Sequence, residues 1–214
     1  MLHSPQLAEQ WQLLEEHEYT KAFQQTMAML ESLSGPDRRD AERLLGWVCY
    51  RQQQYAQASL WFKKACQGSD WADDWLNLAI SAAKQGQLEL SDQALEQVRL
   101  CQQAARYAQA PGLYLQLLAY ARVLSDAGEH TRVVALLDEL ALAYRRVGST
   151  DTTLLYVLRL PFLSSFLALA LSHFARQGQE EPGQAWLEAL EVALDKDGQR
   201  QVAKAIEKLR RGEA

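Results

Sequence analysis

Residues that interrupt helices are scarce in this chain: there are 5 prolines and 11 glycines among 214 residues. Runs of alternating apolar and polar residues between turn signals, which are typical of strands, are missing too. Alanine, leucine, glutamine, glutamate and arginine are abundant, and all five favour helices. With 48% hydrophobic residues the chain can bury a sizeable core. These features predict an all-α globular protein.

Cysteine and histidine are also few, and they lack the spacings that bind metals. The three cysteines are an odd number without a CxxC pair, which argues against a disulfide framework and a zinc site. The four histidines, His3, His17, His130 and His173, are isolated in the sequence. The first ten residues carry no basic segment followed by an apolar run, so no secretory signal is expected. We therefore expect reduced thiols, no metal site and a cytoplasmic protein.

An excess of basic residues is absent as well. The formal net charge is −5, whereas binding to a phosphate backbone needs a basic face, so no nucleic-acid partner is expected. The most apolar run, 154–174, is long enough for a bilayer but is interrupted by Arg159, Pro161 and His173. We predict that it is a buried helix, kinked or broken near Pro161, and that the chain does not insert into membranes.

Sequence signatures of catalysis are missing. There is no GxSxG motif, no glycine loop for phosphates and no locally supported Cys/His pair. The prediction is a protein that is not an enzyme, with no catalytic residue, no cofactor and no metal.

What the sequence does contain is an internal repeat, clearest in the segment 41–98. Leu45-Gly46 recurs as Leu78-Ala79, and each pair of equivalent residues is 33 positions apart. The segment Gln52-Gln53-Gln54-Tyr55 recurs in the same way as Gln85-Gly86-Gln87-Leu88. Ala58, Phe62 and Ala65 recur as Ser91, Leu95 and Val98. The pattern predicts two consecutive helix–turn–helix units built on one template.

This template resembles the tetratricopeptide repeat, a 34-residue helix pair with Trp-x2-Leu-Gly-x2-Tyr in its first helix and Ala-x3-Phe in its second. Trp75-x2-Leu78-Ala79 followed by Ser91-x3-Leu95 makes one copy, and Leu45-Gly46 followed by Ala58-x3-Phe62 makes another. The resemblance implies a right-handed α-α superhelix, or solenoid, in which small residues such as Gly46 let paired helices approach closely. The turn glycines Gly86, Gly128 and Gly178 are 42 and 50 residues apart, so later helices must be longer or carry insertions.

Extending the template predicts one solenoid domain over 1–214. It would contain about five helix–turn–helix units, at approximately 6–35, 37–69, 71–110, 112–148 and 152–195. In the fifth unit, Ala185, Ala189 and Val192 are expected to repeat the packing positions. The segment 197–211 is expected to be a C-terminal capping helix, with Val202, Ile206 and Leu209 on its apolar stripe.

In the family, the first helices of the repeats line a concave face that commonly holds the ligand. Placing that face by the helical period gives a set of candidate partner-binding residues in which apolar and aromatic side chains lie among basic ones. The candidates are Arg43, Trp47, Tyr50, Arg51, Leu76, Asn77, Ile80, Lys84 and Arg122. Such a surface suits a peptide or helix with apolar anchors and an acidic end. The alternative is that Trp47, Tyr50 and Ile80 only pack against the next helix.

The favoured hypothesis is a non-enzymatic interaction module, an adaptor or chaperone, that binds a segment of another protein in this concave face. A second is an immunity protein or inhibitor that covers a partner enzyme. A third is a structural subunit that assembles with itself into a homo-oligomer. The excess of apolar residues in the fifth unit would suit such assembly. Fold analogy alone does not decide among these.

Overall fold

The computed structural model describes residues 3–104 and 112–213, and over these ranges it contains twelve α-helices, one short 3-10 helix and no strand. The predicted all-α class is confirmed. The chain forms two compact units, Met1–Ala110 and Pro111–Ala214, called here the N-terminal and C-terminal units. Their boundary lies between the third and fourth expected repeats. A single domain over the whole chain stays a prediction, and 105–110 of the third repeat lie outside the described residues.

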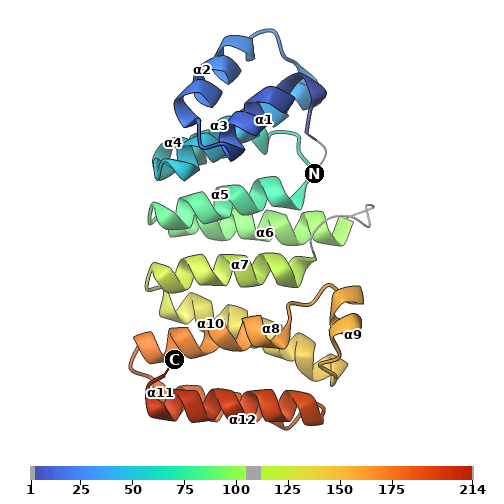
Figure 1. Cartoon of the computed structure of the whole chain (residues 1–214), viewed down its shortest axis with the longest axis vertical. Helices are drawn as coiled ribbons and strands as arrows, with labels where there is room; N and C mark the ends of the chain where they lie inside the picture. Colours follow the sequence, from blue (N-terminus) through green and yellow to red (C-terminus); the bar gives the residue numbers. More distant parts are fainter. Residues whose placement is uncertain (1–2, 105–111, 214) are drawn as a thin grey trace. The chain divides into compact units, whose positions relative to one another are not determined.

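The N-terminal unit consists of sequential helices that pack pairwise (Figure 1). They are η1 (Pro5–Leu7), α1 (Ala8–Glu15), α2 (Tyr19–Met29), α3 (Gly35–Arg51), α4 (Tyr55–Ala65), α5 (Ala72–Lys84) and α6 (Leu88–Ala104). Helix α3 packs on α4, α4 on α5 and α5 on α6. Short turns join α3 to α4 and α5 to α6, so each pair is antiparallel.

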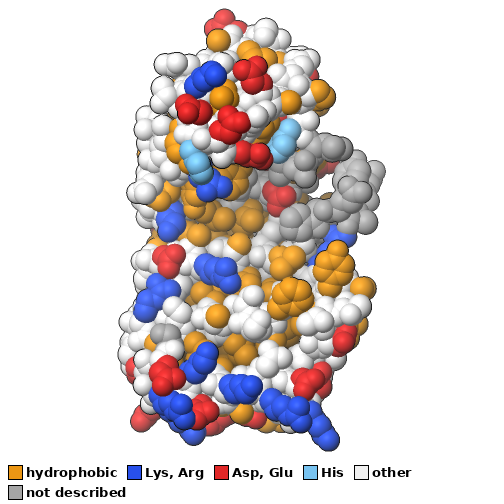
Figure 2. Space-filling view, in the orientation of Figure 1, with side chains coloured by type: hydrophobic (Ala, Val, Ile, Leu, Met, Phe, Trp, Pro, Cys, Tyr) orange, Lys and Arg blue, Asp and Glu red, His pale blue; other side chains and the backbone are white. Residues whose placement is uncertain are grey.

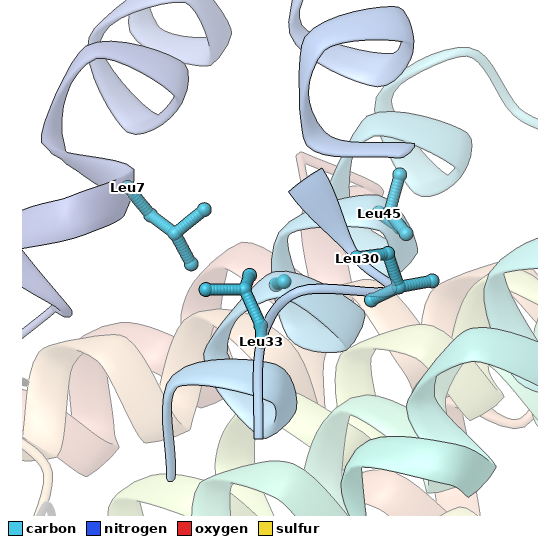
Figure 3. Packing of buried hydrophobic residues seen from close by; sticks show 5 residues of the cluster. Leu7, Leu30, Leu33 and Leu45 are labelled. Carbon is cyan, nitrogen blue, oxygen red and sulfur yellow. The ribbon is translucent and has the colours of Figure 1, made fainter. Parts of the chain in front are cut away.

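The start of the chain is held to α3 by leucine side chains. Leu7, Leu30, Leu33 and Leu45 converge in one buried cluster (Figure 3). Each comes from a different segment: η1, the end of α2, the loop before α3, and α3 itself. Burial of such side chains stabilises a fold by about 1.5–3 kcal/mol each, so this cluster helps to hold α1 and α2 on α3.

The C-terminal unit has six helices. They are α7 (Leu113–Asp126), α8 (His130–Val147), α9 (Thr152–Val157), α10 (Leu163–Arg176), α11 (Glu180–Glu191) and α12 (Lys196–Arg211). The apolar run 154–174 is divided between α9 and α10 with the break at Pro161, as predicted. Among the described residues, none of the helices has both the length and the apolar character that a membrane span requires. Helix α12 packs on α10 and α11 through the predicted stripe Val202, Ile206 and Leu209.

One turn recurs five times and joins α1 to α2, α3 to α4, α5 to α6, α7 to α8 and α10 to α11. In each, one residue has a left-handed backbone conformation; the five are His17, Gln53, Gly86, Gly128 and Gly178, with φ between 60° and 79°. The following N–H always donates to the carbonyl five residues earlier, for example from Gln54 to Cys49 and from Gln179 to Phe174. This is the Schellman arrangement, which satisfies the last carbonyls of a helix.

The left-handed residue of each turn gives a common starting point from which the residues of the five helix pairs can be aligned by counting along the chain. The fifth residue after it is small or β-branched and buried in every pair: Ala22, Ala58, Ser91, Val133 and Gly183. The predicted packing positions of the second and third pairs, which begin at Ala58 and Ser91, agree with this count. The fifth set is wrong by two residues, because Ala185, Ala189 and Val192 are exposed. The buried residues there are Gly183, Leu187 and Leu190, since the register follows the turn at Gly178.

Candidate functional site

The expected binding residues on α3 lie in an aromatic cluster at the C-terminal half of the helix. The Trp47 ring meets Phe62 of α4 edge to face at 5.9 Å and Tyr50 at 5.5 Å. Tyr50 in turn lies 5.4 Å from Tyr55, at the start of α4. Both Trp47 and Tyr50 remain half-buried, so each packs against α4 and also presents part of its ring to solvent.

Basic groups accompany these rings. Arg51 is exposed, and its guanidinium carbon lies 5.9 Å from the centre of the Trp47 ring, within the range of a cation–π interaction. On α5, Ile80 and Lys84 are half-buried, whereas Leu76 and Asn77 are buried. The predicted binding residues of these two helices that reach solvent are therefore Trp47, Tyr50, Arg51, Ile80 and Lys84, and we call them the α3–α5 face.

Arg43 is placed differently from the expectation of a solvent-facing residue. It is buried, and its Nη2 donates to Asp74 Oδ2 at 2.9 Å while its Nη1 donates to Asp40 Oδ1 at 2.7 Å. Burial opposes the charge, but the hydrogen bonds and charges of Asp74 and Asp40 raise the pKa of Arg43 above its ordinary value. The guanidinium therefore ties α3 to α5. Partner binding by this residue stays a prediction, although its donors are engaged within the protein.

The ion pair also fixes the alignment of the α3–α5 face. Helix α4 reverses the chain between α3 and α5, so α3 and α5 run in the same direction. Tyr50 lies about two turns after Arg43, and Ile80 lies about two turns after Asp74. The aromatic side chains of α3 and the apolar and basic side chains of α5 are thus at similar heights. Arg122 is exposed on α7, in the C-terminal unit, so it is described apart from this face.

A cavity of about 300 Å³ lies at the N-terminal ends of α3 and α5. Its lining includes Ser4, Asp40, Arg43 and Trp71. The Asp40 carboxylate already accepts hydrogen bonds from the Ser4 backbone N–H at 2.8 Å and from Trp11 Nε1 at 3.1 Å. Because these polar groups satisfy one another, the cavity is explained by the packing of the ion cluster.

The C-terminal unit contains a hydrogen-bonded chain that the sequence did not reveal. Ser125 Oγ lies 2.9 Å from His173 Nδ1, and His173 Nε2 lies 2.8 Å from His130 Nδ1. The imidazole rings stack with their centres 4.9 Å apart. Burial, His130 and Arg176 lower the pKa of His173 below its ordinary value. Ser125 and His130 are 5 positions apart in the sequence, and His130 and His173 are 43 apart. The one sequence signal for their contact is that all three lie within five residues of a turn, at Gly128 or Gly178.

A serine beside a histidine has the composition of a nucleophile and its base. Here His173 is fully buried and Ser125 is also buried, so a substrate could reach the pair only if the helices separated.

The cysteines do not suit a nucleophilic role better, because burial raises the pKa of the Cys49 thiol to about 11 and also raises the pKa of the Cys66 thiol. In the described part of the chain, no three His, Cys, Asp or Glu side chains group to hold a metal ion. That the protein is not an enzyme stays a prediction.

A second surface feature lies on α9. Five large apolar side chains within nine residues are exposed there: Leu154, Tyr156, Val157, Leu158 and Phe162. Figure 2 shows apolar side chains at the surface in the region where Figure 1 draws α9. The apolar composition of this run predicts a buried helix, but of α9 only Leu155 is buried. The expectation holds for α10 and is wrong for α9, because the break at Pro161 frees α9 from the packing direction of α10.

Comparison with known proteins adds no assignment: neither protein-family models nor curated proteins nor solved structures gave a match.

Proposed function

We propose that this protein is a helical-repeat interaction module of the tetratricopeptide type, and that it binds a segment of another protein on the α3–α5 face. The proposal includes a solenoid arrangement, for which the recurrent left-handed turn and its constant packing register are the support. It also includes a cytoplasmic setting, in keeping with three unpaired thiols.

The observation that carries the proposal is the half-buried state of Trp47 and Tyr50. Their inner edges are fixed by Phe62 and Tyr55, so their exposed edges are held rigidly. Rigid aromatic side chains bind partners at little conformational-entropy cost, which is why they are common among residues that dominate interface energies. Arg51 and Lys84 add positive charge around them, and a ligand with apolar anchors and acidic flanks would complement this face.

The experiment compares charge variants that leave the aromatic packing intact. Arg51→Glu is combined with Lys84→Glu, and the control combines Arg145→Glu with Arg146→Glu, two exposed arginines at the end of α8. Each full-length variant is used to capture proteins from the native host, followed by mass spectrometry. Captured proteins should then be tested as purified segments by calorimetry.

We expect the first pair of changes to remove a partner that the control pair retains, with binding weakened at least tenfold. An unfolding curve that matches wild type would establish that the loss is not a folding defect. If all three proteins capture the same partners with equal affinity, the α3–α5 face is not the binding surface.

A further inference from the structure

Helix α9 presents an apolar surface with a clear geometric cause. At about 100° per residue, the buried Leu155 defines the inner side of the helix, and Val157 falls on the far side. Tyr156 and Leu154 fall on the two flanks, and Leu158 lies nearest to the inner side. The exposed fractions are 1% for Leu155, 67% for Val157, 77% and 37% for Tyr156 and Leu154, and 45% for Leu158. Phe162, 49% exposed, extends the surface beyond the helix.

A helix that is apolar all round is normally buried on all sides. In α9 the inner side contacts the C-terminal unit through Leu155, while the outer side meets solvent. The largest apolar patches on monomeric proteins, about 300–600 Å², often mark interaction sites. If a fully exposed side chain of this size presents roughly 150–200 Å², the five exposed fractions correspond to on the order of 400–550 Å². The patch is therefore at the upper end of what a monomer exposes.

We propose that this surface pairs with the same surface of a second copy of the chain, giving a homodimer related by a two-fold axis. Two copies together would bury on the order of 800–1,100 Å² from these five side chains, and specific interfaces begin near 1,000–1,200 Å² in total. The area is thus sufficient for a two-fold contact when neighbouring atoms are added, and it places the dimer among weak, reversible ones.

The charges around the patch suit self-pairing. Residues 152–158 include no charged side chain, so nothing at the centre of the contact repels an identical surface. The two ends of the run carry opposite charges, Asp151 before α9 and Arg159 after it. A two-fold axis perpendicular to α9 makes the paired helices antiparallel. Asp151 of each copy then lies near Arg159 of the other, and the antiparallel arrangement of the two helix dipoles is favourable.

The test uses sedimentation velocity on the full-length protein from about 1 µM to about 1 mM, the range in which weak complexes form. The wild type should shift from monomer to dimer within this range. Val157→Glu should remain monomeric throughout, because it places a like charge in both halves of the contact. Val192→Glu is the matched control: Val192 is the same residue type, in the same unit, and is 84% exposed at the end of α11. It should dimerise as the wild type does.

Two further measurements separate self-pairing from general stickiness. Circular dichroism at about 1 µM, where the wild type is monomeric too, should give the same helical signal and melting curve for all variants, since neither valine is in the core. A mixture of Val157→Glu with Val157→Lys should recover dimers that neither variant forms alone. A wild type that stays monomeric to about 1 mM would overturn the proposal and leave the surface to a different protein. Dimers that persist in Val157→Glu, or that are lost equally in Val192→Glu, would also overturn it.

Discussion

Replacement of Arg43 by methionine should strongly destabilise the N-terminal unit. Methionine keeps the unbranched aliphatic part of the side chain. The change removes the charge, the donors and the contact of the guanidinium with the Trp71 ring, whose centre lies 5.4 Å from the guanidinium carbon. It leaves Asp40 and Asp74, both buried, without their cationic partner.

The magnitude follows from what each carboxylate retains. Breaking a buried pair by removing one member costs about 3–5 kcal/mol, because an uncompensated charge stays buried. Asp40 keeps two donors, from Ser4 and Trp11, and Asp74 keeps the Ser69 hydroxyl at 2.6 Å. These remaining bonds place the expected loss at the lower end, about 3 kcal/mol. For a unit of this size that corresponds to a melting temperature lower by on the order of 15 °C.

The assay is thermal and urea unfolding followed by circular dichroism, with hydrogen exchange to assign the loss to α3 and α5. Arg38→Met in the same helix serves as the control. Its partner Glu42 is also buried, but the Arg38 side chain is 49% exposed and makes one ion pair, so its loss should cost less than that of the buried Arg43. Adding Asp74→Asn to Arg43→Met should restore about 1–2 kcal/mol, since a neutral amide is less costly to bury. If Arg43→Met is no more destabilising than Arg38→Met, the ion cluster does not hold α3 to α5.

Three other perturbations test the C-terminal unit. Gly183→Ala should destabilise it by about 1–2 kcal/mol in urea unfolding, because the new Cβ would lie 2.7 Å from the Phe174 ring, and overpacking exceeds the gain in helix propensity; equal stability would mean that the ring can move. Asp195 caps α12 and accepts from Thr150. Despite the opposing effect of burial, these bonds hold its pKa at about 2, below the ordinary 3.8, so its contribution is present above pH 3.8 and lost as the pH falls toward 2. Asp195→Ala should cost about 1–2 kcal/mol at neutral pH and flatten that acid limb of a stability–pH curve. The pKa of His173 is lowered, so the unfolded chain binds its proton more readily; stability present above the ordinary pKa of 6.5 should decline as the pH falls below it. His173→Gln should remove this decline in unfolding curves measured from pH 8 to 5, and an unchanged slope would contradict the assignment.

The helical class and the repeat were predictable because both depend on local periodicity. The Ala58, Phe62 and Ala65 template places its residues on one helical face, and all three are buried. The assignment of the binding face rests on the helical period, which gives only an angle around the helix axis. It could not show that Arg43 meets Asp74, 31 residues away, and so becomes an internal tie instead of a solvent-facing group.

The error in the fifth repeat has a specific physical origin. Ala185, Ala189 and Val192 have the spacing of the template, but spacing alone fixes no starting point. The starting point is set by the turn, where a left-handed residue ends one helix and determines how the next one enters. Gly178 was recognisable as that residue, and counting five positions from it gives Gly183. Counting from the turn is not always possible from sequence alone, because the left-handed residue need not be glycine. Gln53 adopts the same left-handed conformation, and its residue type does not reveal it.

The same reasoning explains why α9 escaped prediction. Its residues are as apolar as those of α10, so composition assigned both to the core. Burial, however, depends on which direction a helix faces, and Pro161 uncouples the direction of α9 from that of α10. Among the six residues of α9 only Leu155 is buried, and its other apolar residues are exposed to different degrees. The proposed pairing predicts that a short apolar helix next to a helix-breaking proline can form an interaction surface, and the comparison of Val157→Glu with Val192→Glu tests this in the present chain.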